Sequence, residues 1–109
     1  MNNSTTYRLD FLKPAFHPGL NLTVRRGTKW LKAQPGDTLA LSLTGAEDPI
    51  QKAKCFFAVQ VSFSKISPTW LAFEHAASAR TLSGLLEGMR AAYPDFQETE
   101  DVVCLFFWV

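Results

Sequence analysis

Cysteine and histidine are scarce in this sequence, with two of each among 109 residues. Cys55 and Cys104 lie far apart, and the sequence contains no Cys-x-x-Cys pair. Because this spacing lacks a zinc-ligand pattern, we expect neither a bound metal nor a cofactor. Each cysteine is flanked by apolar residues, which favours two buried, reduced thiols over the alternative of a disulfide.

Long hydrophobic runs are also absent. No segment reaches the roughly 18 consecutive apolar residues that a transmembrane helix requires. The first residues, Met-Asn-Asn-Ser-Thr-Thr, lack the charged-then-apolar order of a secretory signal. We therefore expect a cytoplasmic protein without a membrane partner. A hydrophobic content of 47% is typical of a folded chain, and we predict a single domain over residues 7–109 after a flexible tail at 1–6.

Net charge is small, +1 at pH 7, but the charged residues are unevenly distributed. Residues 1–65 hold nine Lys/Arg and four Asp/Glu, a net charge of +5. Residues 66–109 hold two Lys/Arg and six Asp/Glu, a net charge of −4. A chain of this kind can fold with one basic surface, which favours an anionic partner on that side.

The basic residues gather at a predicted strand that begins at Leu20. In Leu-Asn-Leu-Thr-Val-Arg, apolar and polar residues alternate, which is typical of a strand with one face on a core and the other face open. Four cations and a tryptophan follow at the end of this strand with no acidic residue among them. Such a cluster suits a nucleotide, and the alternative is a solvated basic loop whose tryptophan packs on the core. The cluster consists of Arg25, Arg26, Lys29, Trp30 and Lys32.

Alternation of apolar and polar residues predicts further strands at 7–12, 38–43 and 54–64. The run 102–109 is apolar on both faces, which predicts a strand in the middle of the fold. A strand as long as 54–64 often bends around a small barrel. We expect Leu39, Leu41 and Leu43 to face inward in one strand, and Cys55, Phe57, Val59, Val61 and Phe63 to share one face of the long strand.

Two helices are predicted between the long strand and the last one. A Ser-Pro pair begins the helix 67–77, and Thr81 begins a second helix that ends before Pro94. Gly84 and Gly88 weaken this second helix by about 1 kcal/mol each, and they would permit a close approach to a strand. The order of elements predicts an α+β fold: a small, mostly antiparallel β-barrel of five or six strands with two helices inserted before the last strand.

Several short motifs occur in an order that resembles the ASCH domains of the PUA-like superfamily. The resemblance covers residues 7–109, and its later motifs are similar to those of the short bacterial ASCH proteins, which include the N4-acetylcytidine amidohydrolases. It implies a PUA-like barrel with a cleft beside Thr23 and Arg25 that binds RNA or a modified base. The motifs are Phe11-Leu-Lys-Pro, Leu22-Thr-Val-Arg, Lys29-Trp, Pro35-Gly-Asp, Glu74-His-Ala, Thr81-Leu and Ala92-Tyr-Pro.

The amidohydrolase branch implies a lysine, a threonine and a glutamate in that cleft. Thr23 stands at the family threonine, but Gly-Leu-Asn at 19–21 stands where the family has Gly-x-Lys. No carboxylate follows the His75-Ala pair, and on a helix Glu74 would point about 100° away from its neighbour. Either another residue substitutes or the cleft binds without catalysis. The candidates for substitution are Lys29, Lys32 and Glu74.

Three functions are compatible with the sequence. The first is binding of RNA or of a modified nucleoside or nucleotide, with cations on phosphate and Trp30 stacked on a base. The alternative is a hydrolase acting on a modified nucleoside or on RNA, with a relocated Lys/Glu. A third is a protein-interaction adaptor that uses the acidic segment 95–101 or the helix 67–77. The predicted ligand-binding residues are Asn21, Thr23, Arg25, Arg26, Lys29, Trp30, Lys32 and His75, and the predicted catalytic residues are Thr23, Lys29 and Glu74.

Overall fold

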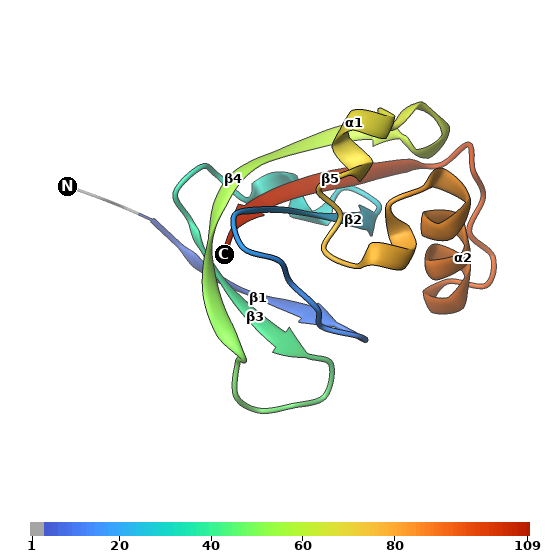
Figure 1. The fold of residues 1–109 in the computed structure, drawn as a ribbon. Coiled ribbons are helices and arrows are strands. Elements are labelled where there is room, and N and C mark those ends of the chain that lie inside the picture. The colour runs from blue at the N-terminus through green and yellow to red at the C-terminus, as the bar shows by residue number, and fades with distance from the viewer. Residues whose placement is uncertain (1–3) are drawn as a thin grey trace.

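One mostly antiparallel sheet runs through residues 4–109, the part of the chain that the computed structural model describes (Figure 1). Its strands are β1 (Thr6–Phe11), β2 (Leu20–Arg26), β3 (Thr38–Leu43), β4 (Gln51–Ser62) and β5 (Asp101–Trp108). They are arranged in the order β1-β3-β4-β5-β2. β1 and β3 pair in parallel and the other pairs are antiparallel, which confirms the predicted mostly antiparallel α+β fold.

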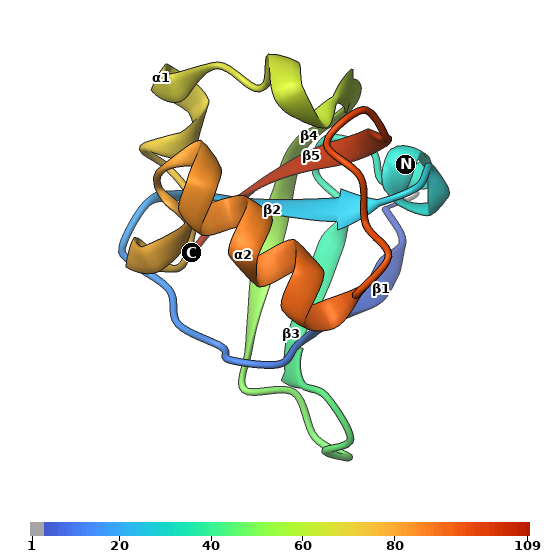
Figure 2. The same cartoon turned by 90° about the vertical axis from the view of Figure 1, so that its right-hand side faces the viewer.

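The connection between β4 and β5 carries the helices, as the sequence predicted. α2 crosses in front of β2 in the view of Figure 2, and the two elements share a hydrophobic core. No helix within residues 4–109 is long and apolar enough to cross a lipid bilayer. The elements of the connection are η2 (Phe63–Lys65), α1 (Pro68–Leu71), η3 (Ala77–Ala79) and α2 (Leu82–Ala92), and a further 3-10 turn, η1 (Lys29–Lys32), follows β2.

The predicted tail at 1–6 overlaps with the sheet. Residues 1–3 lie outside the described residues, but β1 already begins at Thr6. The Thr5 backbone N–H donates a hydrogen bond to Asp37 Oδ1 over 2.9 Å, and the Thr38 N–H donates to the Thr5 carbonyl over 2.8 Å. Thr5 and Thr6 are therefore tied to the start of β3.

Two hydrophobic cores lie on the two faces of β5. Successive residues of a strand point to opposite faces, so a strand that is apolar on both faces is buried within a sheet. β5 lies between β4 and β2 with residues 102–107 buried, as predicted. We call the core beneath the helices the helical core and the other the barrel core. Val102, Cys104 and Phe106 pack in the helical core with Leu22, Val24, Leu85 and Met89, and Val103, Leu105 and Phe107 pack in the barrel core with Leu9, Trp30, Leu39 and Leu41.

β4 changes partner along its length. Its first residues pair with β3, residues from Lys54 onward pair with β5, and the register shifts between Cys55 and Phe57. This β-bulge inserts one residue, which reverses the faces taken by the side chains that follow. The predicted single face from Cys55 to Phe63 is therefore wrong. Cys55 packs in the barrel core, whereas Phe57 and Phe63 pack with the helical core. Both cysteines are free and buried, as predicted.

The first predicted helix is much shorter than the sequence indicated. α1 begins after Ser67, as predicted, but it ends at Leu71 and not at Ala77. The chain then runs alongside β2, where Leu22 forms a parallel bridge with Glu74. A backbone that pairs with a strand uses the hydrogen-bonding groups that a helix would need. Tertiary pairing with β2 has thus replaced the last turns of the predicted helix.

Two expectations about side-chain orientation are also wrong. Leu43 was expected to face inward but is 43% exposed, and it lies at the end of β3 beyond the last residue that pairs with β4, Leu41. The polar face of β2 was expected to be open to solvent, yet Asn21 is 0% and Thr23 3% exposed. The Asn21 side chain donates hydrogen bonds to the carbonyls of two residues in the loop that precedes β2, and these hydrogen bonds stabilise the loop.

The two glycines of α2 have different environments. A Cβ atom at Gly84 would clash with the Ser78 carbonyl oxygen, whereas a Cβ atom at Gly88 would meet nothing within 4 Å. The close approach predicted for these glycines is therefore made by Gly84 alone, and it is to η3 rather than to a strand.

We expect Gly84→Ala to lower the free energy of unfolding by about 1–3 kcal/mol, because the added methyl group overpacks against a backbone carbonyl. The matched variant Gly88→Ala should raise the free energy of unfolding by up to about 1 kcal/mol through helix propensity alone. Urea denaturation of both variants measures the difference. Equal shifts in the two variants would contradict the close approach of α2 to η3.

Candidate functional site

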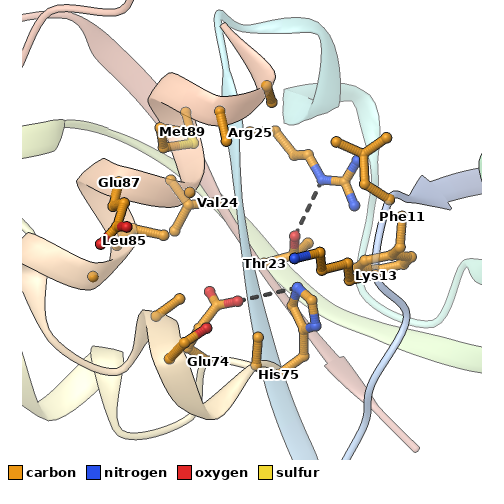
Figure 3. A pocket seen from close by; sticks show the side chains of 18 of the residues that line it. Phe11, Lys13, Thr23, Val24, Arg25, Glu74, His75, Leu85, Glu87 and Met89 are labelled. Atoms are coloured by element: carbon orange, nitrogen blue, oxygen red, sulfur yellow. Dashed lines mark hydrogen bonds and ion pairs between the residues drawn. The ribbon is translucent and has the colours of Figure 1, made fainter. Parts of the chain in front are cut away.

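A cavity of about 700 Å³ lies between β2 and α2 (Figure 3). The end of β1 with the residues after it, β2, the segment after α1, and α2 each contribute to its lining. Its size is within the range of about 300–1,000 Å³ that is usual for small-molecule sites. The wall includes the apolar residues Val24, Leu85 and Met89, and the polar side chains are those of Lys13, Thr23, Arg25, Glu74 and His75, among others.

Thr23 and Arg25 lie on one face of β2, two residues apart. Arg25 Nε donates to Thr23 Oγ1 over 3.1 Å, and Arg25 Nη1 donates to the Asp10 carbonyl over 2.7 Å. The guanidinium carbon also lies 4.6 Å from the centre of the Phe11 ring. Burial lowers the pKa of Arg25 to about 10, so the guanidinium stays charged at neutral pH. Its Nη2 forms no hydrogen bond with any described residue and is free to bind a ligand.

Glu74 is held at the inner end of the cavity by the backbone. Its main chain bridges Leu22 of β2, and Arg80 Nε donates to its carbonyl over 3.0 Å. The side chain is buried, with 2% of the residue exposed, and Oε1 lies 3.0 Å from His75 Nε2. Oε2 is buried and has no hydrogen-bond partner among the described residues. Buried polar atoms are rarely left unpaired, so Oε2 is a candidate acceptor for a ligand.

One proton is shared between Glu74 and His75. His75 Nδ1 lies 3.0 Å from the Ala15 carbonyl oxygen, which can only accept, and so Nδ1 carries a hydrogen. Burial raises the pKa of Glu74 to about 8 and lowers the pKa of His75 to about 4. At pH 7 the carboxyl is therefore protonated and donates from Oε1 to the neutral imidazole. Glu74 Oε2 is then a neutral carbonyl-type acceptor.

The close contact of Glu74 with His75 corrects the helical geometry expected for this pair. On a helix, adjacent side chains point about 100° apart. Here the pair follows the bridge to β2, outside any helix, and the two side chains meet. Figure 3 shows the Glu74 carboxyl and the His75 ring directed toward each other at the side of the cavity that faces Thr23.

Lys13 is a lining residue that sequence reasoning missed. It follows β1, and in Figure 3 its side chain points into the cavity on the side of Thr23. The candidates for a relocated lysine were Lys29 and Lys32, neither of which lines this cavity. Lys13 stands inside the motif Phe11-Leu-Lys-Pro, and its place directly before a proline that ends the strand was the available signal.

A second, smaller hollow of about 250 Å³ adjoins the cavity and shares Arg25, Asp10 and Tyr93 with it. Lys29 and Arg26, which were predicted as ligand-binding residues, line this hollow and not the main cavity. The predicted basic cluster is thus divided between two adjacent sites.

Three members of the predicted site have mainly structural contacts. Trp30 is 8% exposed and packs in the barrel core, 6.0 Å from the Tyr7 ring centre, so its face is not open to a base. Lys32 Nζ lies 4.7 Å from that same Tyr7 ring and lines neither the cavity nor the hollow. Arg26 pairs with Asp95 at 2.9 Å and with Glu100 at 2.8 Å, which ties the end of β2 to the loop before β5.

Metal-ligand types do not converge in the described structure. Within residues 4–109, no three His, Cys, Asp or Glu side chains are placed to hold an ion. The lining of the cavity offers hydroxyl, carboxyl, imidazole and cationic side chains.

No protein-family model and no curated protein matches the sequence. Among solved structures, the fold is similar to the crystal structure of an ASCH domain from Lactobacillus crispatus JV V101, with a TM-score of 0.68. The chain has the fold of an ASCH domain. The match covers 96% of this chain and 79% of the other at 12% sequence identity.

The ASCH fold expected from the sequence motifs is thereby confirmed. At 12% identity the likeness concerns the fold and not the activity, and the amidohydrolase branch stays a prediction. Within this ASCH fold, β2 delivers Thr23 and Arg25, and the segment bridged to β2 delivers Glu74 and His75.

Proposed function

We propose that the cavity binds a nucleobase, either an unstacked base of RNA or the base of a modified nucleoside. The observation that carries this is the convergence of Thr23, Arg25 and the unpartnered Glu74 Oε2 on one cavity of about 700 Å³. Fixed polar groups in an otherwise apolar pocket orient a flat polar ligand, and proteins read RNA sequence mainly through unstacked bases.

The hydrogen-bonding groups complement the edge of a base. Arg25 Nη2 offers a donor to a carbonyl oxygen or a ring nitrogen, and Glu74 Oε2 offers an acceptor to an exocyclic or ring N–H. The Thr23 hydroxyl can act as either. A pyrimidine base carries an N–H donor next to a carbonyl oxygen or ring nitrogen that accepts. Each hydrogen bond formed with the protein removes an unpaired buried group. The ASCH fold supports this assignment, because PUA-like barrels commonly bind RNA or modified bases.

Closing the cavity without touching its polar groups tests the proposal. Gly88 lines the cavity and a Cβ there meets no atom, so Gly88→Leu should fill the space beside α2 without a clash at the backbone. We expect it to weaken binding at least about tenfold, a loss of about 1.4 kcal/mol. Calorimetric titration with cytidine, uridine, adenosine, guanosine and N4-acetylcytidine measures the affinity.

Ser83→Leu is the matched control, because Ser83 is exposed on the same helix and does not line the cavity. It should bind like the unsubstituted protein. If no nucleoside or nucleotide binds, or if Gly88→Leu and Ser83→Leu bind equally well, base binding in this cavity is excluded.

A second candidate function is hydrolysis of an amide on a modified base. It is favoured by one observation: Lys13, Thr23 and Glu74 line the same cavity, which supplies the three residue types of the amidohydrolase branch although the lysine stands elsewhere in the chain. A hydroxyl becomes an effective nucleophile only beside a group that takes its proton. Lys13, which lines the same pocket as Thr23, is the candidate for that role, because the Glu74 carboxyl already carries a proton at pH 7.

The same N4-acetylcytidine samples test this candidate. Release of cytidine and acetate that disappears in Lys13→Met and in Thr23→Val would support hydrolysis, whereas binding without any cytidine after long incubation would leave the protein a binding module. Lys32→Met is the control for the loss of a cation, because Lys32 lies outside the cavity.

A further inference from the structure

The hollow beside the cavity has an unusual distribution of charge. Four cationic side chains line it together with one carboxylate, Asp10, and two aromatic residues, Trp30 and Tyr93. Its volume of about 250 Å³ is large enough for a phosphate group and a few water molecules. The cations are those of Arg8, Arg25, Arg26 and Lys29.

Two of these cations are neutralised within the protein. Arg8 Nε lies 2.7 Å from Asp10 Oδ1, so Arg8 forms an ion pair with the one carboxylate of the hollow. Arg26 is paired with Asp95 and Glu100. Both arginines are therefore part of the wall, and their charges are compensated by acidic partners.

Among the described residues the other two cations have no ion-pair partner, and in this sense their charges are uncompensated. Within residues 4–109, neither Arg25 nor Lys29 has a carboxylate oxygen within the 4.0 Å of an ion pair. Arg25 is fixed by neutral partners, the Thr23 hydroxyl and the Asp10 carbonyl, and Lys29 Nζ lies 5.6 Å from the centre of the Trp30 ring. Two uncompensated cations in one concave site attract an anion.

We infer that this hollow is the phosphate subsite of the base-binding cavity, so that the ligand is a nucleotide unit rather than a free nucleoside. Arg25 belongs to both sites, and the two hydrogens of its free Nη2 would contact the base and the phosphate. Lys29 would complete the phosphate contact as a point charge. This assignment depends on the proposed function of the cavity.

The contacts of Trp30 support this reading of the basic cluster. Its ring packs in the barrel core and Trp30 also lines the hollow, with Lys29 Nζ over the ring, so it forms an apolar wall beneath Lys29. The cations at the end of β2 then bind the phosphate, and the base lies in the separate cavity. An arrangement of this kind reads a base and a backbone phosphate together.

A comparison of nucleosides with nucleotides tests the subsite. We expect the 5′- or the 3′-monophosphate of the best-binding nucleoside to bind about tenfold more tightly than the nucleoside at low salt, because charge-assisted hydrogen bonds are the stronger ones. In Lys29→Gln this preference should fall to less than about threefold. Lys32→Gln removes the same charge three positions away but outside both sites, and it should retain the full preference.

The outcomes separate this inference from the function on which it depends. A nucleoside that binds as tightly as both monophosphates, or equal losses in Lys29→Gln and Lys32→Gln, would overturn the phosphate subsite and leave base binding intact. Nucleotide binding that is unaffected by Gly88→Leu would instead overturn base binding in the cavity. A dinucleotide distinguishes the source of the phosphate. If the dinucleotide binds as tightly as the monophosphate, the ligand is an RNA strand. If the dinucleotide binds only as tightly as the nucleoside, the ligand is a free nucleotide.

Discussion

Replacement of Trp30 by alanine is expected to lower the free energy of unfolding by about 3–5 kcal/mol, the usual cost of truncating a buried tryptophan. Trp30 is 8% exposed and packs in the barrel core against Tyr7. The sequence left two alternatives open for this residue, a stacking surface for a base or a ring packed on the core. Urea denaturation followed by far-UV circular dichroism measures the loss, and this probe does not depend on the fluorescence of the removed residue.

Leu31→Ala is the control for this substitution, because Leu31 belongs to the same 3-10 turn but is 37% exposed. It should change the free energy of unfolding by less than about 1 kcal/mol, as exposed substitutions usually do. Trp30→Phe keeps an aromatic ring in the core and should leave ligand affinity unchanged. A protein in which Trp30→Ala is as stable as Leu31→Ala but no longer binds its ligand would contradict the core assignment.

Stability should fall as pH rises above neutrality, by about 1–2 kcal/mol between pH 6.5 and pH 8. Burial raises the pKa of Glu74 from 4.5 in the unfolded chain to about 8, so the folded protein retains a proton that the unfolded chain has already released. Stability from this group is therefore complete below pH 4.5 and is lost as pH rises through 8. His75, with its pKa lowered to about 4, acts in the opposite direction only below pH 6.5.

Glu74→Gln separates this effect from other titrations. The amide has nearly the shape of the protonated carboxyl, its NH₂ group can donate to His75 Nε2, and it has no charge at any pH. We expect the variant to be as stable as the unsubstituted protein below pH 4.5, where the carboxyl is protonated in both the folded and the unfolded chain, and increasingly more stable as pH rises to 8.5. Glu87→Gln, a charge change at an exposed position on the rim of the same cavity, should keep the original pH dependence. Parallel stability profiles for Glu74→Gln and the unsubstituted protein would show that Glu74 is ionised in the folded state.

Strands were predicted well because their signals are local. The run 102–109 is apolar at every position, which predicted a strand covered on both faces, and β5 lies between two strands with residues 102–107 buried. Thr81 was placed at the start of the second helix, and its hydroxyl accepts the Gly84 N–H. The bulge in β4 could not be predicted, because it depends on where β4 leaves β3 for β5, and a single residue inserted there reverses the faces of all that follow.

Part of the candidate site was predicted because its signal is local, and the rest was not because it depends on tertiary packing. Thr23 and Arg25 were placed together from the two-residue period of a strand, and they share one face in the structure. The sequence left the position of Trp30 open, because a ring beside cations has the same sequence whether its face is buried or open. Lys13 was overlooked, because its approach to Thr23 depends on the path of the chain between β1 and β2.

By itself, the sequence determined the order and type of the elements and the pairing of a hydroxyl with a guanidinium on β2, because both follow from periods of two or of 3.6 residues. Only the tertiary structure decided that the chain leaves α1 early to pair with β2. That pairing buries Glu74 against His75, and the desolvation that makes its carboxyl a neutral acceptor comes from residues distant in the sequence. Tertiary packing likewise divided the basic cluster. Trp30 lies in the core, Arg26 is ion-paired in the wall of the hollow, and Arg25 and Lys29 have no ion-pair partner among the described residues. Only the fold decides this, because the availability of a cation depends on which acidic residues lie beside it.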